Sequence, residues 1–98
     1  MKKTRLPAQK IIHLHGSFDM MACLTTERVR LVQTVRGKPL SITSLAEELG
    51  RNRGAVTRDV KMLAELGLVR LRRETNPGHG IVTIVEPVAH RLALRANI

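Results

Sequence analysis

The chain has 98 residues, the size of one small domain, with 17 Lys and Arg against 8 Asp and Glu and a formal net charge of +9. Apolar residues make up 43% of the chain, which argues against intrinsic disorder, and the positive charge predicts an anionic partner: nucleic acid, a membrane surface or an acidic protein. The absence of Trp and Tyr, with Phe18 as the single Phe, argues against proteins that stack single-stranded bases on aromatic side chains.

Cysteine content and hydropathy indicate a cytoplasmic protein. The single cysteine, Cys23, excludes an internal disulfide framework and suits a reducing compartment. No apolar run approaches the length of a membrane span. The basic N-terminus leads into a segment that His, Gly, Ser and Asp interrupt, so a signal peptide is not expected.

Residues 1–24 are predicted to form an N-terminal arm. Residues 10–14 have the composition of a short strand, which Gly16 ends. A short helical turn that begins at Ser17 or Asp19 is expected after it.

A first helix is predicted over residues 25–37, with Thr25 or Thr26 as its N-cap and Gly37 as its end. Its apolar side is formed by Val29, Leu31, Val32 and Val35. Its outward-facing residues are expected to be Arg28, Arg30, Gln33 and Arg36.

Two further helices are predicted with a tight turn between them. Ser41 is the expected N-cap of the second helix, whose apolar face is Ile42, Leu45, Ala46 and Leu49, and Gly50 has the freedom for a left-handed C′ position. Asn52 caps the third helix, over residues 53–66, with a buried stripe of Val56, Val60, Leu63 and either Leu66 or Met62. A glycine-containing connection of about three residues between two helices is typical of a helix-turn-helix.

The chain after Gly67 is predicted to form a β-hairpin. The segment LVRLRRE alternates apolar and basic residues, TNPGHG is a turn cluster, and IVTIVE is a second β-branched run. Three helices followed by a hairpin predict an α+β fold, mainly α, of the winged helix-turn-helix kind over residues 25–87. Residues 88–98 form a tail that fits a helix or a strand and packs on the domain or on a second subunit.

The third helix carries the residues expected to read DNA. If its apolar stripe faces the core, the exposed side presents Arg53, Gly54, Thr57, Arg58 and Lys61. The N-terminal part of this helix lies in the major groove in helix-turn-helix proteins. There an Arg donates two hydrogen bonds to guanine, a Thr contacts a base edge or a thymine methyl, and Gly54 allows a close approach.

Neighbouring residues are expected to hold the DNA backbone. Residues 50–73 contain seven Lys and Arg and two acids, so five of the nine net positive charges lie on the turn, the third helix and the first wing strand. Arg51 is placed for a phosphate, as is the helix N-terminus at Asn52, and the wing brings Arg70, Arg72 and His79 to the flanking backbone or minor groove. The predicted DNA-binding residues are therefore Arg51, Asn52, Arg53, Gly54, Thr57, Arg58, Lys61, Arg70, Arg72 and His79.

Asp59 is an acid on this otherwise basic helix, and two interpretations stay open. In the first, it pairs with Arg58 or Arg51 and orients that side chain. In the second, it is a solvent-exposed partner of a residue one turn away, or it compensates the helix dipole.

A metal site and an enzyme active site find little support. His13, His15 and Cys23 invite a metal-sensor interpretation, but metal sites normally have several such residues at tight spacing. The sequence contains no glycine-rich phosphate loop, catalytic triad signature or carboxylate cluster. No catalytic residue, cofactor or metal ligand is predicted.

The segment from Leu24 to Val69, LTTERVRLVQTVRGKPLSITSLAEELGRNRGAVTRDVKMLAELGLV, resembles winged helix-turn-helix transcriptional regulators of the MarR-like and ArsR-like kind. The resemblance covers about half of the chain, and RDVKML is its most specific part. It implies DNA binding, usually as a homodimer and often as an autorepressor. Some similar small regulators look like the antitoxin half of toxin–antitoxin pairs.

Three functions follow as hypotheses. The first is a sequence-specific regulator that binds double-stranded DNA as a homodimer and acts as a repressor, with the arm and tail left over for dimerisation. The second is an antitoxin-like module that binds a small toxin-like protein through its arm or tail. The third is a basic architectural or RNA-binding protein with little sequence preference.

Overall fold

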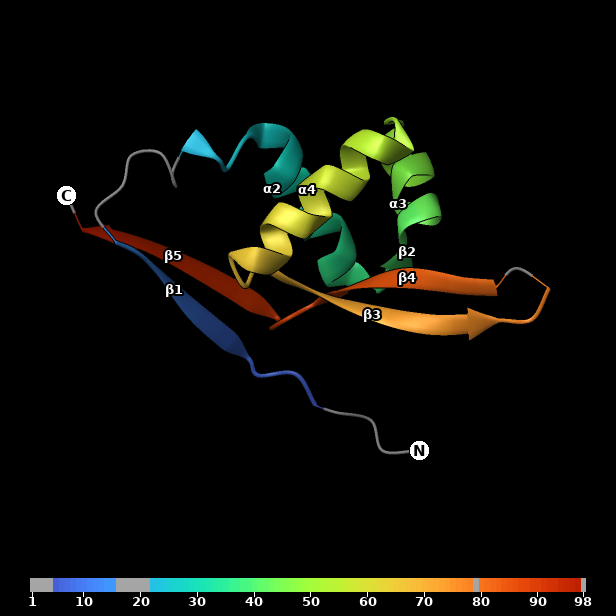
Figure 1. The fold of residues 1–98 in the computed structure, drawn as a ribbon. Helices are drawn as coiled ribbons and strands as arrows, with labels where there is room; N and C mark the ends of the chain where they lie inside the picture. The colour runs from blue at the N-terminus through green and yellow to red at the C-terminus, as the bar shows by residue number, and fades with distance from the viewer. Residues whose placement is uncertain (1–4, 16–21, 79, 98) are drawn as a thin grey trace.

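The structure, a computed structural model, describes residues 5–15, 22–78 and 80–97. In these residues the three long helices gather on one side of the strands, and a long hairpin extends away from them (Figure 1). The elements in chain order are β1 (Gln9–His15), α2 (Thr26–Gly37), β2 (Leu40–Ser41), α3 (Ile42–Leu49), α4 (Arg53–Glu65), β3 (Val69–Asn76), β4 (Gly80–Pro87) and β5 (Arg91–Asn97). The α+β architecture is as predicted, but strands occupy nearly as much of the chain as helices, so the expectation of a mainly α fold is not confirmed.

The helix starts follow the predicted capping residues. The Thr25 hydroxyl accepts a hydrogen bond from the Arg28 amide at 3.3 Å, and the Ser41 hydroxyl accepts one from the Ser44 amide at 3.1 Å. Each contact satisfies an amide that has no partner within its own helix. The sequence therefore located the starts of α2 and α3 correctly.

The wing is a three-stranded antiparallel sheet in the order β2-β4-β3. β3 and β4 pair along their whole length, from Val69 opposite Pro87 to Asn76 opposite Gly80. The two residues of β2 pair with the other edge of β4, a strand that was not predicted, and Ser41 is also the predicted N-cap of α3. A two-residue strand is too short to show an alternating pattern in the sequence. It can be recognised only from its pairing with the free edge of β4.

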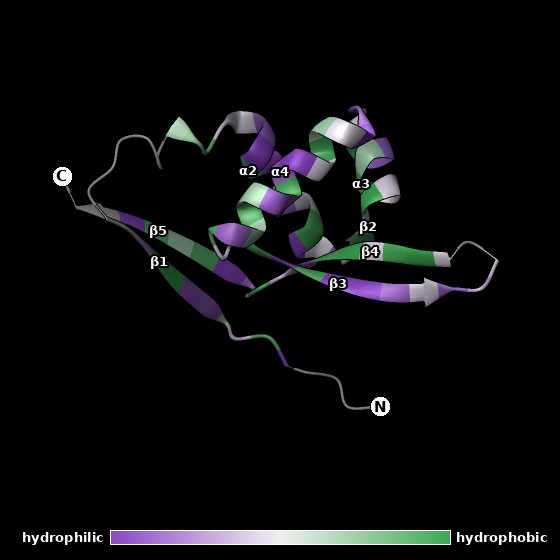
Figure 2. Cartoon of the chain, in the orientation of Figure 1, coloured by the Kyte–Doolittle hydropathy of each residue, from purple (hydrophilic) through white to green (hydrophobic). Residues whose placement is uncertain are grey.

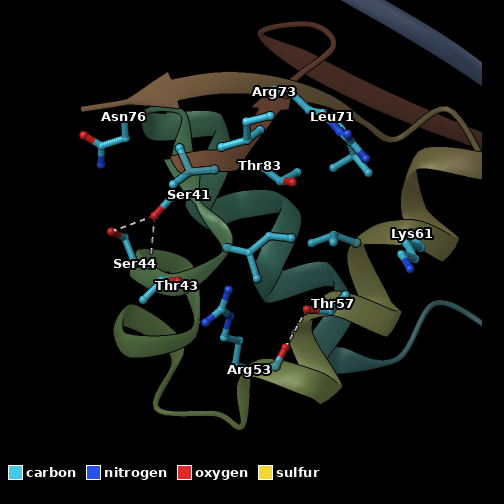
Figure 3. Close-up of a pocket in the computed structure, with 14 residues that line it drawn as sticks. Ser41, Thr43, Ser44, Arg53, Thr57, Lys61, Leu71, Arg73, Asn76 and Thr83 are labelled. Carbon is cyan, nitrogen blue, oxygen red and sulfur yellow. Dashed lines mark hydrogen bonds between the residues drawn. The ribbon is translucent and has the colours of Figure 1, made fainter. Parts of the chain in front are cut away.

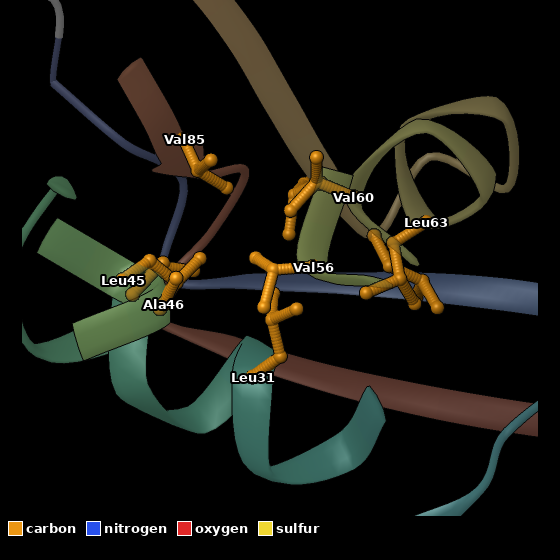
Figure 4. Close-up of a cluster of buried hydrophobic side chains, with 10 residues drawn as sticks. Leu31, Leu45, Ala46, Val56, Val60, Leu63 and Val85 are labelled. Carbon is orange, nitrogen blue, oxygen red and sulfur yellow. The ribbon is translucent and has the colours of Figure 1, made fainter. Parts of the chain in front are cut away.

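The core lies where the three helices meet the sheet (Figure 4). Its central side chains are fully buried and come from α2, α3, α4 and β4, namely Leu31, Val35, Leu45, Val56, Val60, Leu63 and Val85. Figure 2 shows mostly apolar residues along β4 and mostly polar residues along β3. Val29 was expected on the apolar side of α2, but it is 39% exposed because it lies beyond the edge of this core.

The arm and the tail form a second sheet, in which β1 and β5 pair in parallel from Gln9 opposite Arg91 to His15 opposite Asn97. The predicted arm strand is confirmed, and the ambiguous tail is a strand. Lys10 Nζ donates to the Gly67 carbonyl at 3.1 Å, which ties this ribbon to the end of α4. The helical turn predicted after Gly16 lies outside the described residues.

Leu63→Ala is expected to lower the free energy of unfolding by about 2–5 kcal/mol, because it leaves a cavity among fully buried side chains. Urea unfolding followed by circular dichroism measures this loss. Ile81→Ala is the matched control, since Ile81 is 66% exposed, and its cost should stay below about 1 kcal/mol. Equal losses for the two variants would contradict the placement of the core.

Candidate nucleic-acid interface

The connection between α3 and α4 is the tight turn that the sequence predicts. Gly50 has a φ of 62°, the left-handed conformation that lacks a steric penalty only for glycine. The Arg51 amide donates to the Ala46 carbonyl at 3.0 Å, which closes the end of α3. Only three residues therefore separate α3 from α4, and the two helices are in contact.

Asn52 starts α4 with its side-chain oxygen. Its Oδ1 accepts hydrogen bonds from the amides of Gly54 at 2.7 Å and Ala55 at 3.3 Å. A Cβ on residue 54 would lie 3.0 Å from that oxygen. Gly54 therefore has a local role in capping, besides the close approach to a ligand that the sequence suggested.

An open groove of about 860 Å³ lies between α4, the start of α3 and the wing (Figure 3). Arg53, Thr57 and Lys61 line it from α4, where a spacing of four residues puts them on one face. Polar side chains also enter the groove from α3 and the sheet, among them Thr43, Ser44, Arg73, Asn76 and Thr83. Three predicted DNA-binding residues are thus brought together, with cations at both the helix and the wing side.

Two hydroxyls in this groove make local hydrogen bonds. Thr57 Oγ1 donates to the Arg53 carbonyl at 2.8 Å within α4, and Ser41 Oγ donates to Ser44 Oγ at 3.0 Å. The threonine proton is therefore used inside the helix. Its methyl group and the oxygen lone pairs are left for a ligand.

The two sides of β3 carry different cations. Arg73 lines the groove beside α4, whereas Arg70 and Arg72 line a second groove, of about 740 Å³, with Arg36, Lys38 and His90; Leu71 borders both grooves. Side chains alternate along a strand, so Arg73 shares a side with Leu71. In the sequence, Arg73 belongs to a run of basic residues with Arg70 and Arg72, and strict alternation from Val69 is the signal that places it on the side of Leu71 instead.

Arg70 and Arg72 are paired with acids on their own sheet. Arg70 Nη2 lies 3.3 Å from Glu86 Oε2, and Arg72 makes short contacts with Glu74 and Glu86. The hydrogen bonds to Glu74 and Glu86 raise the pKa of Arg72 above its ordinary value. These two arginines lie away from the α4 groove. Their contact with DNA stays a prediction.

The remaining predicted residues have separate positions. Arg58 is exposed on α4 but does not line the groove, because it follows Thr57 by about 100° around the helix. His79 lies outside the described residues.

Asp59 is buried, so its interpretation as a solvent-exposed residue is wrong. Its Oδ2 accepts a hydrogen bond from Arg51 Nη1 at 2.8 Å, and its Oδ1 accepts one from Arg28 Nε at 3.0 Å. Pairing with Arg51 was one of the expected alternatives. Arg28 was expected to face solvent, and sequence periodicity gave no signal for its role.

The pKa of Asp59 reflects opposing effects. Burial raises the pKa, but hydrogen bonds from Arg51 and Arg28, together with their charges, outweigh it and hold the pKa below the ordinary 3.8. The ionised form is therefore favoured in the folded chain.

Two further features bear on function classes. Among residues 5–15, 22–78 and 80–97, no three His, Cys, Asp or Glu side chains gather as metal ligands would. Within the same ranges, no helix is both long and apolar enough to cross a membrane.

A low pKa for Asp59 predicts acid sensitivity. Its ion pairs contribute stability that is complete above the unfolded-state pKa near 3.8 and is lost as the pH falls through the lower folded-state value. Asp59→Asn should therefore cost about 2 kcal/mol at pH 7, since the arginines are partly solvated. Urea unfolding from pH 6 to pH 2.5 tests this: the difference between the two proteins should shrink below about pH 4, and a constant difference would contradict it.

Comparison with known proteins identifies relatives of this fold. A family model described as HVO_A0114 matches residues 23–86, and no curated protein matches the chain. A solved structure of a possible transcriptional regulator from Methanosarcina mazei Go1 is similar at 21% identity and a TM-score of 0.59, over 70% of this chain and 62% of that one.

Two structures from Lactococcus lactis are also similar. The zinc-responsive MarR family member ZitR matches at 25% identity and a TM-score of 0.58, over 65% of this chain and 43% of that chain. A cysteine-to-serine mutant of ZitR in complex with DNA matches at 25% identity and a TM-score of 0.56, over 65% and 42%. The chain spans less than two thirds of each of these three proteins, and the shared part confirms the winged helix-turn-helix fold of MarR-like regulators.

Proposed function

The chain belongs to the HVO_A0114 family, and we propose that it is a DNA-binding transcriptional regulator that recognises a specific double-stranded sequence. The observation that carries this proposal is the polar groove in which Arg53, Thr57 and Lys61 of α4 face Arg73 of the wing. The solved ZitR mutant in complex with DNA supports it, because its fold is similar at 25% identity. Regulators of this kind are not enzymes, which agrees with the lack of catalytic motifs in the sequence.

The proposed mode of binding places the N-terminal half of α4 in the major groove. A helix with its side chains is about 10–12 Å across and matches the major groove, which is about 12 Å wide. Arg53 lies in the first turn of α4, where its guanidinium reaches a guanine edge, and Thr57 presents its methyl group one turn later. Lys61 and Arg73 lie farther along the groove and are suited to phosphates.

We further propose that the chain acts as a homodimer on an inverted repeat and represses transcription. A single small DNA-binding module buries only about 600–1,000 Å² of protein surface, which limits both affinity and specificity. The ribbon of β1 and β5 is the part of the chain left over for dimerisation, and its face away from the core exposes Ile11. A dimer bound across a promoter represses by occupying it. The antitoxin-like alternative stays a prediction, and no contact among the described residues favours it.

Selection from a random duplex library at about 150 mM salt should enrich one palindromic motif, with half-sites about one helical turn apart. High salt suppresses binding that depends on charge alone. Sedimentation of the chain with a selected duplex should give two chains for each duplex. Retention of DNA without an enriched motif would contradict sequence-specific recognition, and one chain on each duplex would contradict the homodimer.

Arg53→Ala should relax sequence choice at one position of each half-site, by about 1–3 kcal/mol of discrimination, because it removes a base contact. Competition binding with the selected duplex and single-base variants measures this loss. Arg30→Ala is the matched control, since Arg30 is exposed on α2 outside the groove. Unchanged base preference in Arg53→Ala would show that α4 does not read that position through this residue.

A further inference from the structure

The buried carboxylate of Asp59 connects three parts of the chain. Among the residues that the structure describes, Asp59 is the only buried polar or charged one, with 7% of its surface exposed. It lies on α4 two residues after Thr57, on the side that faces α2. A carboxylate in such a place is costly unless both of its oxygens have charged partners.

Arg28 is one of these charged partners, and it also donates a hydrogen bond to the segment before α2. Its Nε donates to Asp59 Oδ1 at 3.0 Å, and its Nη1 donates to the Cys23 carbonyl at 2.6 Å. One guanidinium therefore joins α4, the first turn of α2 and the segment that precedes α2. Because a guanidinium is planar and its donors are fixed in direction, these bonds constrain orientation as well as distance.

Arg51 provides the other partner. Its Nη1 donates to Asp59 Oδ2 at 2.8 Å, and its Nη2 lies 3.4 Å from Glu27 Oε2. Both ends of this guanidinium are thus directed at carboxylates, and its side chain is only 21% exposed. A phosphate contact by Arg51, as the sequence suggested, requires it to leave both acids.

Apolar packing decides which side of α4 is buried, but it specifies the exact rotation of the helix less sharply. The stripe of Val56, Val60 and Leu63 is buried by contacts that have no preferred direction, whereas hydrogen bonds to a carboxylate depend on angle as well as distance. The two oxygens of Asp59 each bind a different arginine, one on α2 and one in the turn. A rotation of α4 about its axis would lengthen at least one of these bonds.

We propose that Arg28 and Asp59 are positioning residues for DNA recognition: they fix the rotation of α4 so that Arg53, Thr57 and Lys61 face the groove, and they hold Arg51 away from the DNA backbone. This inference rests on the proposed function. It assigns sequence discrimination in part to two residues that do not contact DNA. It also implies that Arg51 does not bind a DNA phosphate as long as Asp59 holds its guanidinium.

Asp59→Asn and Arg28→Met test the two halves of the proposal. For each variant, the dissociation constant is measured with the selected duplex and with a scrambled duplex of equal composition, over a range of KCl concentrations. In both variants, the ratio of the dissociation constant for the scrambled duplex to that for the selected duplex should fall at least about fivefold. This is the lower end of the effect expected when one base contact is lost. In Asp59→Asn the freed Arg51 should also steepen the salt dependence with the scrambled duplex by about 0.9, the equivalent of one added phosphate contact.

Two controls separate positioning from a loss of stability. Measurements are made at a temperature where circular dichroism shows each variant folded, and Arg28→Met keeps the Asp59–Arg51 pair if Asp59→Asn proves too unstable. Asp59→Asn combined with Arg51→Ala should return the salt dependence to that of the unsubstituted chain. A variant that is merely less stable would weaken both duplexes by the same factor and leave the salt dependence unchanged.

The outcomes distinguish this inference from the proposed function. Arg30→Met, an exposed substitution on α2, should leave the ratio of dissociation constants unchanged. If the unsubstituted chain discriminates between the duplexes and both Asp59→Asn and Arg28→Met keep that ratio, the positioning role is wrong and the proposed function stands. If the unsubstituted chain itself does not discriminate, the proposed function fails, and the inference fails with it.

Discussion

The burial of one stripe of α4 is the constraint on which the rest of the structure depends. Val56, Val60 and Leu63 are fully buried against Leu31 of α2 and the sheet residue Val85. Each such side chain contributes about 1.5–3 kcal/mol through the removal of apolar surface from water. Once this side of the helix is committed to the core, the opposite side must present its basic and polar residues to the groove.

The positively charged side chains of this chain lie on different sides of the wing hairpin, because of the strands and helix that carry them. The cations of α4 at positions 53 and 61 share the groove with Arg73, whereas Arg70 and Arg72 bind Glu86 on the other side of the hairpin. A net charge of +9 therefore does not spread evenly over one DNA-binding surface. Cations without an acidic partner attract phosphates more strongly than those already paired, so the α4 groove is the better candidate interface.

The parallel pairing of arm and tail gives the chain a second structural unit. Parallel strands need a long connection, and here the whole helical domain and the wing lie between β1 and β5. A two-stranded sheet is marginally stable alone, so its ties to Gly67 and its contact with the core through Ile12 and Leu92 matter for its stability. The register places the exposed Ile11 and Leu94 on opposite faces of this ribbon, so each face keeps one partly exposed apolar side chain.

The amino-acid sequence by itself determined the three helices, their capping residues, the left-handed turn at Gly50 and the hairpin. These features depend on neighbouring residues: hydroxyl and amide caps, a glycine at positive φ, and periods of 3.6 and 2. It also placed Arg53, Thr57 and Lys61 on the exposed side of α4, together with Gly54 and Arg58, because the apolar stripe indicates which side is buried. Tertiary structure alone decided what joins residues far apart in the chain. It paired β1 with β5, placed Arg73 rather than Arg72 beside α4, and buried Asp59 between Arg28 and Arg51. Local sequence patterns do not predict these contacts, because each forms only when separate elements pack against one another.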